Sequence, residues 1–316
     1  MFLAHALRGF ERAARAPRLA AVLWSLHLLF AVAAALPLGL FLFGALGHAP
    51  EGDRLLDGMT LDLFAILGRA AGGFGALLGA GLATALLLVL LGNALASGGV
   101  LEALTSADPR PFLHRFGRGA GRFFWRFLRM GLVALPSAAV AAALLGGPLF
   151  YWRRRLEESG PETTRILLGL AGLALALLGI ATVTMALDLA RIRAVREDHR
   201  RPIRLFFRCL GTTLRHPVRL LGLWLVNTLA FSALLALYGL LASLVPVTTG
   251  AGIAALVVLQ QLAMFGRALL RVALWAGELG VAADLARRHR WGAPPPYAPR
   301  IQAPPPEPAP DPAPAG

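Results

Sequence analysis

The chain has 316 residues, a hydrophobic fraction of 57%, a mean hydropathy of +0.65 and a formal net charge of +14. Charged residues make up only 15% of the chain, and long apolar runs recur along its whole length. These values exclude a soluble globular domain and favour a helical membrane protein. The single cysteine, Cys209, excludes an intramolecular disulfide and a paired-cysteine metal or redox site.

The apolar runs predict an all-α fold, a polytopic transmembrane helical bundle of about six spans. The first run is too long for the apolar core of a cleavable signal peptide, so we expect it to remain as a span. Proline dominates residues 293–316, which predicts a disordered tail after a membrane domain over residues 1–292. The expected spans are 18–46, 73–95, 130–151, 166–187, 218–244 and 251–284.

Three arginine-rich segments precede spans, and in each the arginines fall on one helical face. Arg8, Arg12 and Arg15 form the first stripe, and the other two stripes lie before the third and fifth spans. This pattern predicts amphipathic helices in the membrane interface, with arginines at headgroup level and aromatic groups such as Phe123 and Phe127 in the bilayer. The lipid-headgroup candidates are Arg115, Arg118, Arg122, Arg126, Arg129, Arg201, Arg204 and Arg208.

These segments divide the chain into three units, each a basic amphipathic helix followed by a membrane hairpin. Short matches support a repeat: Arg15-Ala-Pro17 corresponds to Arg215-His-Pro217, Arg110-Pro111 to Arg201-Pro202, and Asp188-Leu-Ala-Arg191 to Asp284-Leu-Ala-Arg287. Internal repeats are common in membrane transporters, although they also occur in membrane proteins that transport nothing.

The arginine distribution predicts the orientation. Most arginines lie in the N-terminal segment, the second and fourth connections and the C-terminal part. The positive-inside rule makes this side cytoplasmic, which places both termini in the cytoplasm and the protein in the bacterial inner membrane. The basic charge is therefore interpreted as contact with anionic lipid, and we expect no nucleic-acid partner.

The last span carries one polar stripe, which provides the candidates for a ligand site or transport path: Gln260, Arg267, Arg271 and Glu278. Two registers remain open. If the span begins near Gly250, Arg271 reaches the cytoplasmic interface after about 30 Å and Glu278 lies in water. If the repeat sets the register, Asp284 aligns with Asp188 at the membrane edge and the stripe lies within the bilayer.

The two Asp-Leu-Ala-Arg motifs place a carboxylate at the end of a helix, where the helix dipole does not favour it. We therefore expect structural ion pairs among four residues, Asp188, Arg191, Asp284 and Arg287. The sequence contains no metalloprotease, nucleophile-elbow, phosphate-loop or clustered Cys/His motif. We accordingly expect no enzymatic activity, no cofactor and no metal site.

The Gly98-Gly99 turn leading to Phe112–Phe127, and the stretch from Asp188 to Pro217, resemble a group of bacterial six-helix membrane proteins. This group includes the membrane domain fused to some glycerophosphoryl diester phosphodiesterases. The catalytic barrel of those fused enzymes has no counterpart in this chain, so the resemblance implies the membrane architecture without phosphodiesterase residues.

Three functions compete. The favoured one is an accessory or scaffold protein that engages anionic lipid, a protein partner or a second copy of itself through its arginine-rich helices. A transporter or permease using the polar stripe of the last span is the alternative. A lipid-modifying membrane enzyme would need a nucleophile or an acid–base pair, which the motif search does not locate.

Overall fold

The computed structural model describes residues 2–46, 74–106, 108, 110–156, 161–199, 201–246 and 249–288. The predicted proline-rich tail lies outside these residues. The described part is all-helical, and its helices in chain order are α1 (Phe2–Arg15), α2 (Pro17–Leu46), α4 (Phe74–Thr105), α5 (Phe112–Arg155), α6 (Glu162–Glu197), α7 (Pro202–Arg215), α8 (Pro217–Ser243) and α9 (Gly250–Arg288).

Six of these helices, α2, α4, α5, α6, α8 and α9, are long and apolar enough to cross a membrane. The prediction of a multi-pass helical membrane protein is therefore confirmed. The span boundaries differ most at α5, because the second arginine-rich segment and the third span form one continuous helix of 44 residues. No helix-ending signal separates the two parts, whereas Pro17 and Pro217 each begin a new helix after α1 and α7.

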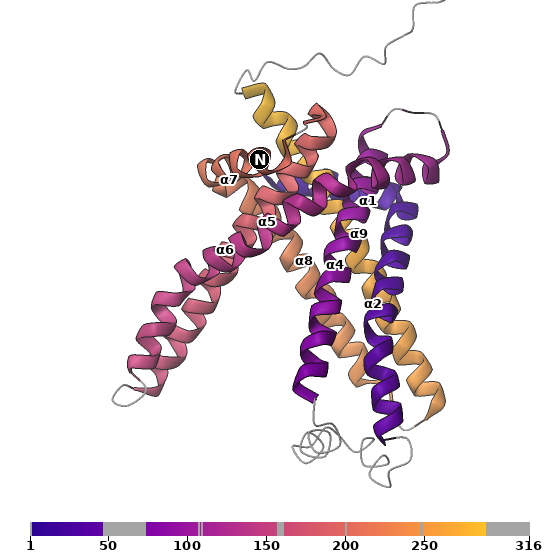
Figure 1. Ribbon diagram of the computed structural model, residues 1–316, viewed down its shortest axis with the longest axis vertical. Helices are drawn as coiled ribbons and strands as arrows, with labels where there is room; N and C mark the ends of the chain where they lie inside the picture. The colour runs from indigo at the N-terminus through magenta and orange to yellow at the C-terminus, as the bar shows by residue number, and fades with distance from the viewer. Residues whose placement is uncertain are drawn as a thin grey trace, which may run out of the picture.

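Figure 1 shows α2, α4, α8 and α9 running side by side, while the α5–α6 hairpin slopes away from them. The two groups meet at one end of the molecule and diverge toward the other. Both short helices, α1 and α7, lie at the end where the groups meet. Helix α1 packs on α9, α7 packs on α6, and the first part of α5 packs on α4.

Small residues allow these amphipathic helices to approach their supporting spans. A Cβ atom at Gly119 of α5 would lie 2.6 Å from the carbonyl oxygen of Gly98 on α4. A Cβ atom at Gly9 of α1 would collide with the carbonyl oxygen of Ala273 on α9. The equivalent face of α7 buries Cys209 completely. Backbone contact of this kind is typical of helix packing in membranes.

The core lies where the two helix groups meet and includes Phe123, Phe127, Met130, Leu189 and Trp275. The prediction that Phe123 and Phe127 dip into the bilayer was therefore wrong, because both rings are fully buried in the protein. Away from this junction the spans expose large apolar side chains along α5, α6, α8 and α9. This distribution fits a protein whose outer surface is covered by lipid rather than water.

Candidate functional site

Four charged residues from α6 and α9 form what we call the buried charge cluster: Asp188, Arg191, Arg271 and Glu278. The Asp188 carboxylate is 0% exposed and sits between two guanidinium groups. Arg271 Nη2 lies 2.9 Å from Asp188 Oδ2, and Arg191 Nη1 lies 3.2 Å from Asp188 Oδ1. This shared carboxylate links the α5–α6 hairpin to α9 at the point where the two helix groups meet.

Aromatic rings enclose the guanidinium groups. Arg191 Cζ lies 5.7 Å from the centre of the Phe127 ring, and Arg271 Cζ lies 4.6 Å from the Trp275 ring. Each geometry allows a cation–π contact. The Glu278 side chain is also buried, with 1% of the residue exposed, but neither of its oxygens has a hydrogen-bond partner in the described part of the chain. Glu278 is therefore the least satisfied member of the cluster.

Helix α9 begins at Gly250, the starting point of the first predicted register. That register's expectation that Glu278 lies in water was wrong, because Glu278 is buried in the protein. Helix α1 covers this end of α9, because the neighbouring Gly277 packs against the backbone of His5.

The two Asp-Leu-Ala-Arg motifs are not placed equivalently. Asp188 contacts Arg271, whereas Asp284 lies beyond it along α9 and accepts a 2.8 Å contact from His5 Nε2 on α1. Arg287 also pairs with Asp284, as the three-residue spacing predicts. Asp188 thus joins two spans, while Asp284 attaches the N-terminal helix to the last span.

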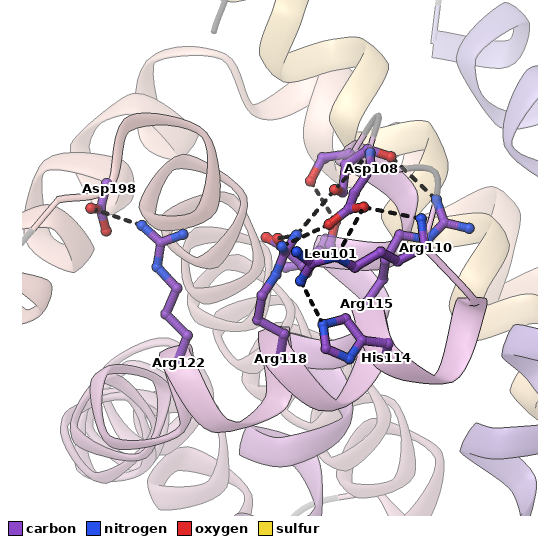
Figure 2. Close-up of polar contacts among 11 residues, drawn as sticks. Leu101, Asp108, Arg110, His114, Arg115, Arg118, Arg122 and Asp198 are labelled. Carbon is purple, nitrogen blue, oxygen red and sulfur yellow. Dashed lines mark hydrogen bonds and ion pairs between the residues drawn. The ribbon is translucent and has the colours of Figure 1, made fainter. Parts of the chain in front are cut away.

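Most arginines of the α5 stripe face carboxylates of the chain itself. Figure 2 shows Arg118 directed toward Asp108 and Arg122 directed toward Asp198. Arg118 also lies 2.8 Å from Glu102 of α4. Arg126 likewise lies 2.6 Å from the Asp198 carboxylate, whereas Arg115 donates a 3.3 Å hydrogen bond to the backbone carbonyl oxygen of Ser106. Arg129 is exposed.

These ion pairs lower the pKa of two carboxyl groups. A hydrogen bond from Arg126 and the positive charge of Arg122 hold the pKa of Asp198 below its ordinary value. The backbone N–H of Arg110, followed by Arg118, has the same effect on the pKa of Asp108. The sequence pattern predicts the arginines but not these partners. Asp108 lies shortly before the α5 arginines and is a local signal, whereas Asp198 precedes the α7 arginines and is 72 residues from Arg126.

Helix α7 differs from α5 because its arginines face outward. Its buried face consists of Leu205, Phe206, Cys209, Thr212 and Thr213. Its exposed face alternates basic and apolar side chains, and none of these arginines has an ion pair within the described residues. This outward set, which we call the α7 basic face, consists of Arg201, Ile203, Arg204, Phe207, Arg208, Leu214 and Arg215.

The described residues also bear on two other kinds of site, a metal site and a small-molecule cavity. Within the described residues, no group of three or more His, Cys, Asp or Glu side chains could hold a metal ion. A recess lined by Phe2, His5, Arg219, Val281 and Asp284 lies beside α1, and its internal space of about 10 Å³ has room for about one water molecule. This is far below the roughly 300–1,000 Å³ typical of small-molecule sites, and the recess contains no member of the predicted polar stripe.

Comparisons with known proteins do not assign a family: no family model, curated protein or solved structure matches this chain. The resemblance to the membrane domain of fused phosphodiesterases therefore stays a prediction. The chain's own geometry provides two candidate functional features, the α7 basic face and the buried charge cluster.

Proposed function

We propose that this integral membrane protein is an accessory or scaffold protein that engages anionic lipid of the cytoplasmic leaflet through α7, assisted by α1. The observation that supports the proposal most directly is the α7 basic face. Arginines with aliphatic stems beside exposed Ile203, Phe207 and Leu214 suit the boundary between headgroups and acyl chains. With α7 at the cytoplasmic face, both termini are cytoplasmic, and the membrane is the bacterial inner membrane.

The packing of the short helices supports the proposal that the chain consists of three related units. Counting from the first residue of α1, α5 and α7, an arginine occupies the seventh position in each, as Arg8, Arg118 and Arg208. A small residue follows in each case, as Gly9, Gly119 and Cys209. Each unit's amphipathic helix rests on the second span of the unit before it, and α1 completes the series by resting on α9. We propose that the units form a ring of interfacial helices over the bundle.

The lipids that surround the protein provide the test. The full chain would be extracted directly into polymer-bounded nanodiscs, and the fraction of anionic lipid in them compared with that of the parent membrane. Three arginines near an anionic surface contribute about 1 kcal/mol each. We therefore expect the triple variant Arg201→Gln, Arg204→Gln and Arg208→Gln to lose most of the anionic enrichment.

A matched control is available on the opposite side of the membrane. The triple variant Arg153→Gln, Arg154→Gln and Arg155→Gln removes the same charge from the last turn of α5, and it should keep the enrichment. An α7 variant that folds and retains full enrichment would overturn the proposal.

The transporter alternative rests on one observation, the buried Glu278 without a hydrogen-bond partner. The four residues of the predicted stripe do not share one environment, because Gln260 and Arg267 are exposed whereas Glu278 is buried. Flux of a candidate solute into vesicles, lost on Glu278→Gln, would favour transport over the accessory function.

A further inference from the structure

Arg267 is an exposed cation within a membrane span. It lies about 25 Å along α9 from Gly250, inside the roughly 30 Å hydrocarbon thickness and toward the cytoplasmic leaflet. Its guanidinium Cζ lies 5.7 Å from the centre of the Phe231 ring on α8. No carboxylate of the described chain forms an ion pair with it. A charge at this depth is costly, and intramembrane arginines therefore mark sites of interaction.

The neighbouring charges do not neutralise Arg267. One turn further along, Arg271 is 25% exposed and already shares Asp188 with Arg191. Glu278 lies three turns beyond Arg267 and is buried away from it. Arg267 and Arg271 thus place two guanidinium groups on one face of α9. The carboxylate that pairs with Arg271 is the buried Asp188.

An apolar surface extends from Arg267 toward the outer leaflet. On the same side of α9, Val257 and Ile253 are each more than half exposed. The α5–α6 hairpin slopes away from α8 and α9 at this level, as Figure 1 shows. The protein therefore leaves a cationic group at the head of an uncovered apolar strip.

We propose that Arg267 and Arg271 bind the phosphate of an anionic phospholipid from the cytoplasmic leaflet. The acyl chains of this lipid run along the exposed strip of α9 that contains Val257 and Ile253. The phosphate supplies the counter-charge that Arg267 lacks, and guanidinium groups form bidentate hydrogen bonds with phosphate oxygens. The site lies within a span, so it is separate from the α7 basic face, and only the assignment of its leaflet rests on the orientation in the proposed function.

Native mass spectrometry of the full-length protein tests this site. The purified protein would be delipidated and then supplied with phosphatidylglycerol or with phosphatidylcholine of identical chains. We expect the protein to retain phosphatidylglycerol preferentially, because the quaternary ammonium of phosphatidylcholine competes with the arginines for the phosphate of that lipid. Hydrogen bonds to charged groups contribute enough that Arg267→Gln should reduce the bound phosphatidylglycerol about tenfold or more. Arg154→Gln, at an exposed arginine of the opposite side, should have no effect.

The outcomes separate the two proposals. Equal retention of the two lipids by the unmodified protein would overturn the site without the use of any variant. A folded Arg267→Gln protein that retains phosphatidylglycerol normally would also overturn it. If retention falls in the α7 triple variant but not in Arg267→Gln, the lipid belongs to the α7 basic face, and the proposed function survives without this site.

Discussion

The carboxylate of Asp188 on α6 lies 2.9 Å from the guanidinium of Arg271 on α9, and this ion pair joins the two helix groups of the molecule. Away from this contact the two groups diverge toward the other end of the molecule (Figure 1). Arg191 approaches the same carboxylate from within α6. Asp188 is consequently a fully buried acceptor that two arginines share.

Asp188→Asn should destabilise the protein by about 3–5 kcal/mol, because it removes the counter-charge of a buried pair and leaves the arginines in place. Unfolding in detergent measures the loss. The matched control is Asp198→Asn, which also lies between two arginines but is half exposed. A surface ion pair contributes about 0–1 kcal/mol, so this control should change stability little. Equal losses in the two variants would contradict a special role for the buried carboxylate.

Glu278→Gln should leave stability within about 1 kcal/mol of the original value or raise it, because an unsatisfied buried carboxyl group is itself costly. Its two oxygens accept no hydrogen bond in the described structure, so the amide loses no contact. The same unfolding measurement compares it directly with Asp188→Asn. A loss as large as that of Asp188→Asn would show instead that the Glu278 charge supports Arg191 and Arg271.

Hydropathy was sufficient to predict six spans, since six helices of the described chain are long and apolar enough to cross a bilayer. Hydropathy could not show which apolar side chains face protein and which face lipid. Phe123 and Phe127 are equally apolar in either setting, and only the packing of α5 on its neighbours buries them. The continuity of α5 was missed for a related reason, because an interfacial helix and a span require no break between them.

The polar contacts, too, could be predicted only in part from the sequence. The three-residue spacing of Asp188 and Arg191 is a local signal, and the structure contains that pair. The approach of Arg271 to Asp188 is a contact between distant segments, and no pattern in one sequence specifies it. The pairing of Arg122 and Arg126 with Asp198 is likewise long-range. Because of these contacts, some of the α5 arginines that were predicted to face lipid headgroups face the protein instead.

Gly119→Ala should destabilise the protein by about 1–3 kcal/mol through overpacking of the α4–α5 contact. The added methyl group would collide with the Glu102 side chain and the Gly98 carbonyl oxygen. Gly117→Ala is the matched control on the same helix, because a Cβ there meets nothing within 4 Å. Alanine is the better helix former, so this control should be neutral or stabilising by about 0.5–1 kcal/mol. Thermal unfolding of both variants distinguishes close packing from general sensitivity of the helix.

Cys209 should remain unreactive in the folded protein. Its side chain is fully buried, and burial raises the pKa of the thiol from 9.0 to about 11 although the Arg193 charge opposes this shift. At pH 8 the thiol is therefore neutral as well as covered, and N-ethylmaleimide should label it only after unfolding. The control is Leu214→Cys in a Cys209→Ala background, where an exposed position of the same helix should be labelled rapidly.

The raised pKa of Cys209 also predicts a pH dependence of stability. Below pH 9 the thiol is protonated in both the folded and the unfolded chain, so it does not make the unfolding free energy depend on pH. Between pH 9 and about 11 only the unfolded chain releases the proton. Stability should fall with rising pH over that interval, by at most about 1.4 kcal/mol per pH unit. The difference in unfolding free energy between the original protein and Cys209→Ala measures this effect, and a difference that stays constant from pH 8 to pH 11 would contradict it.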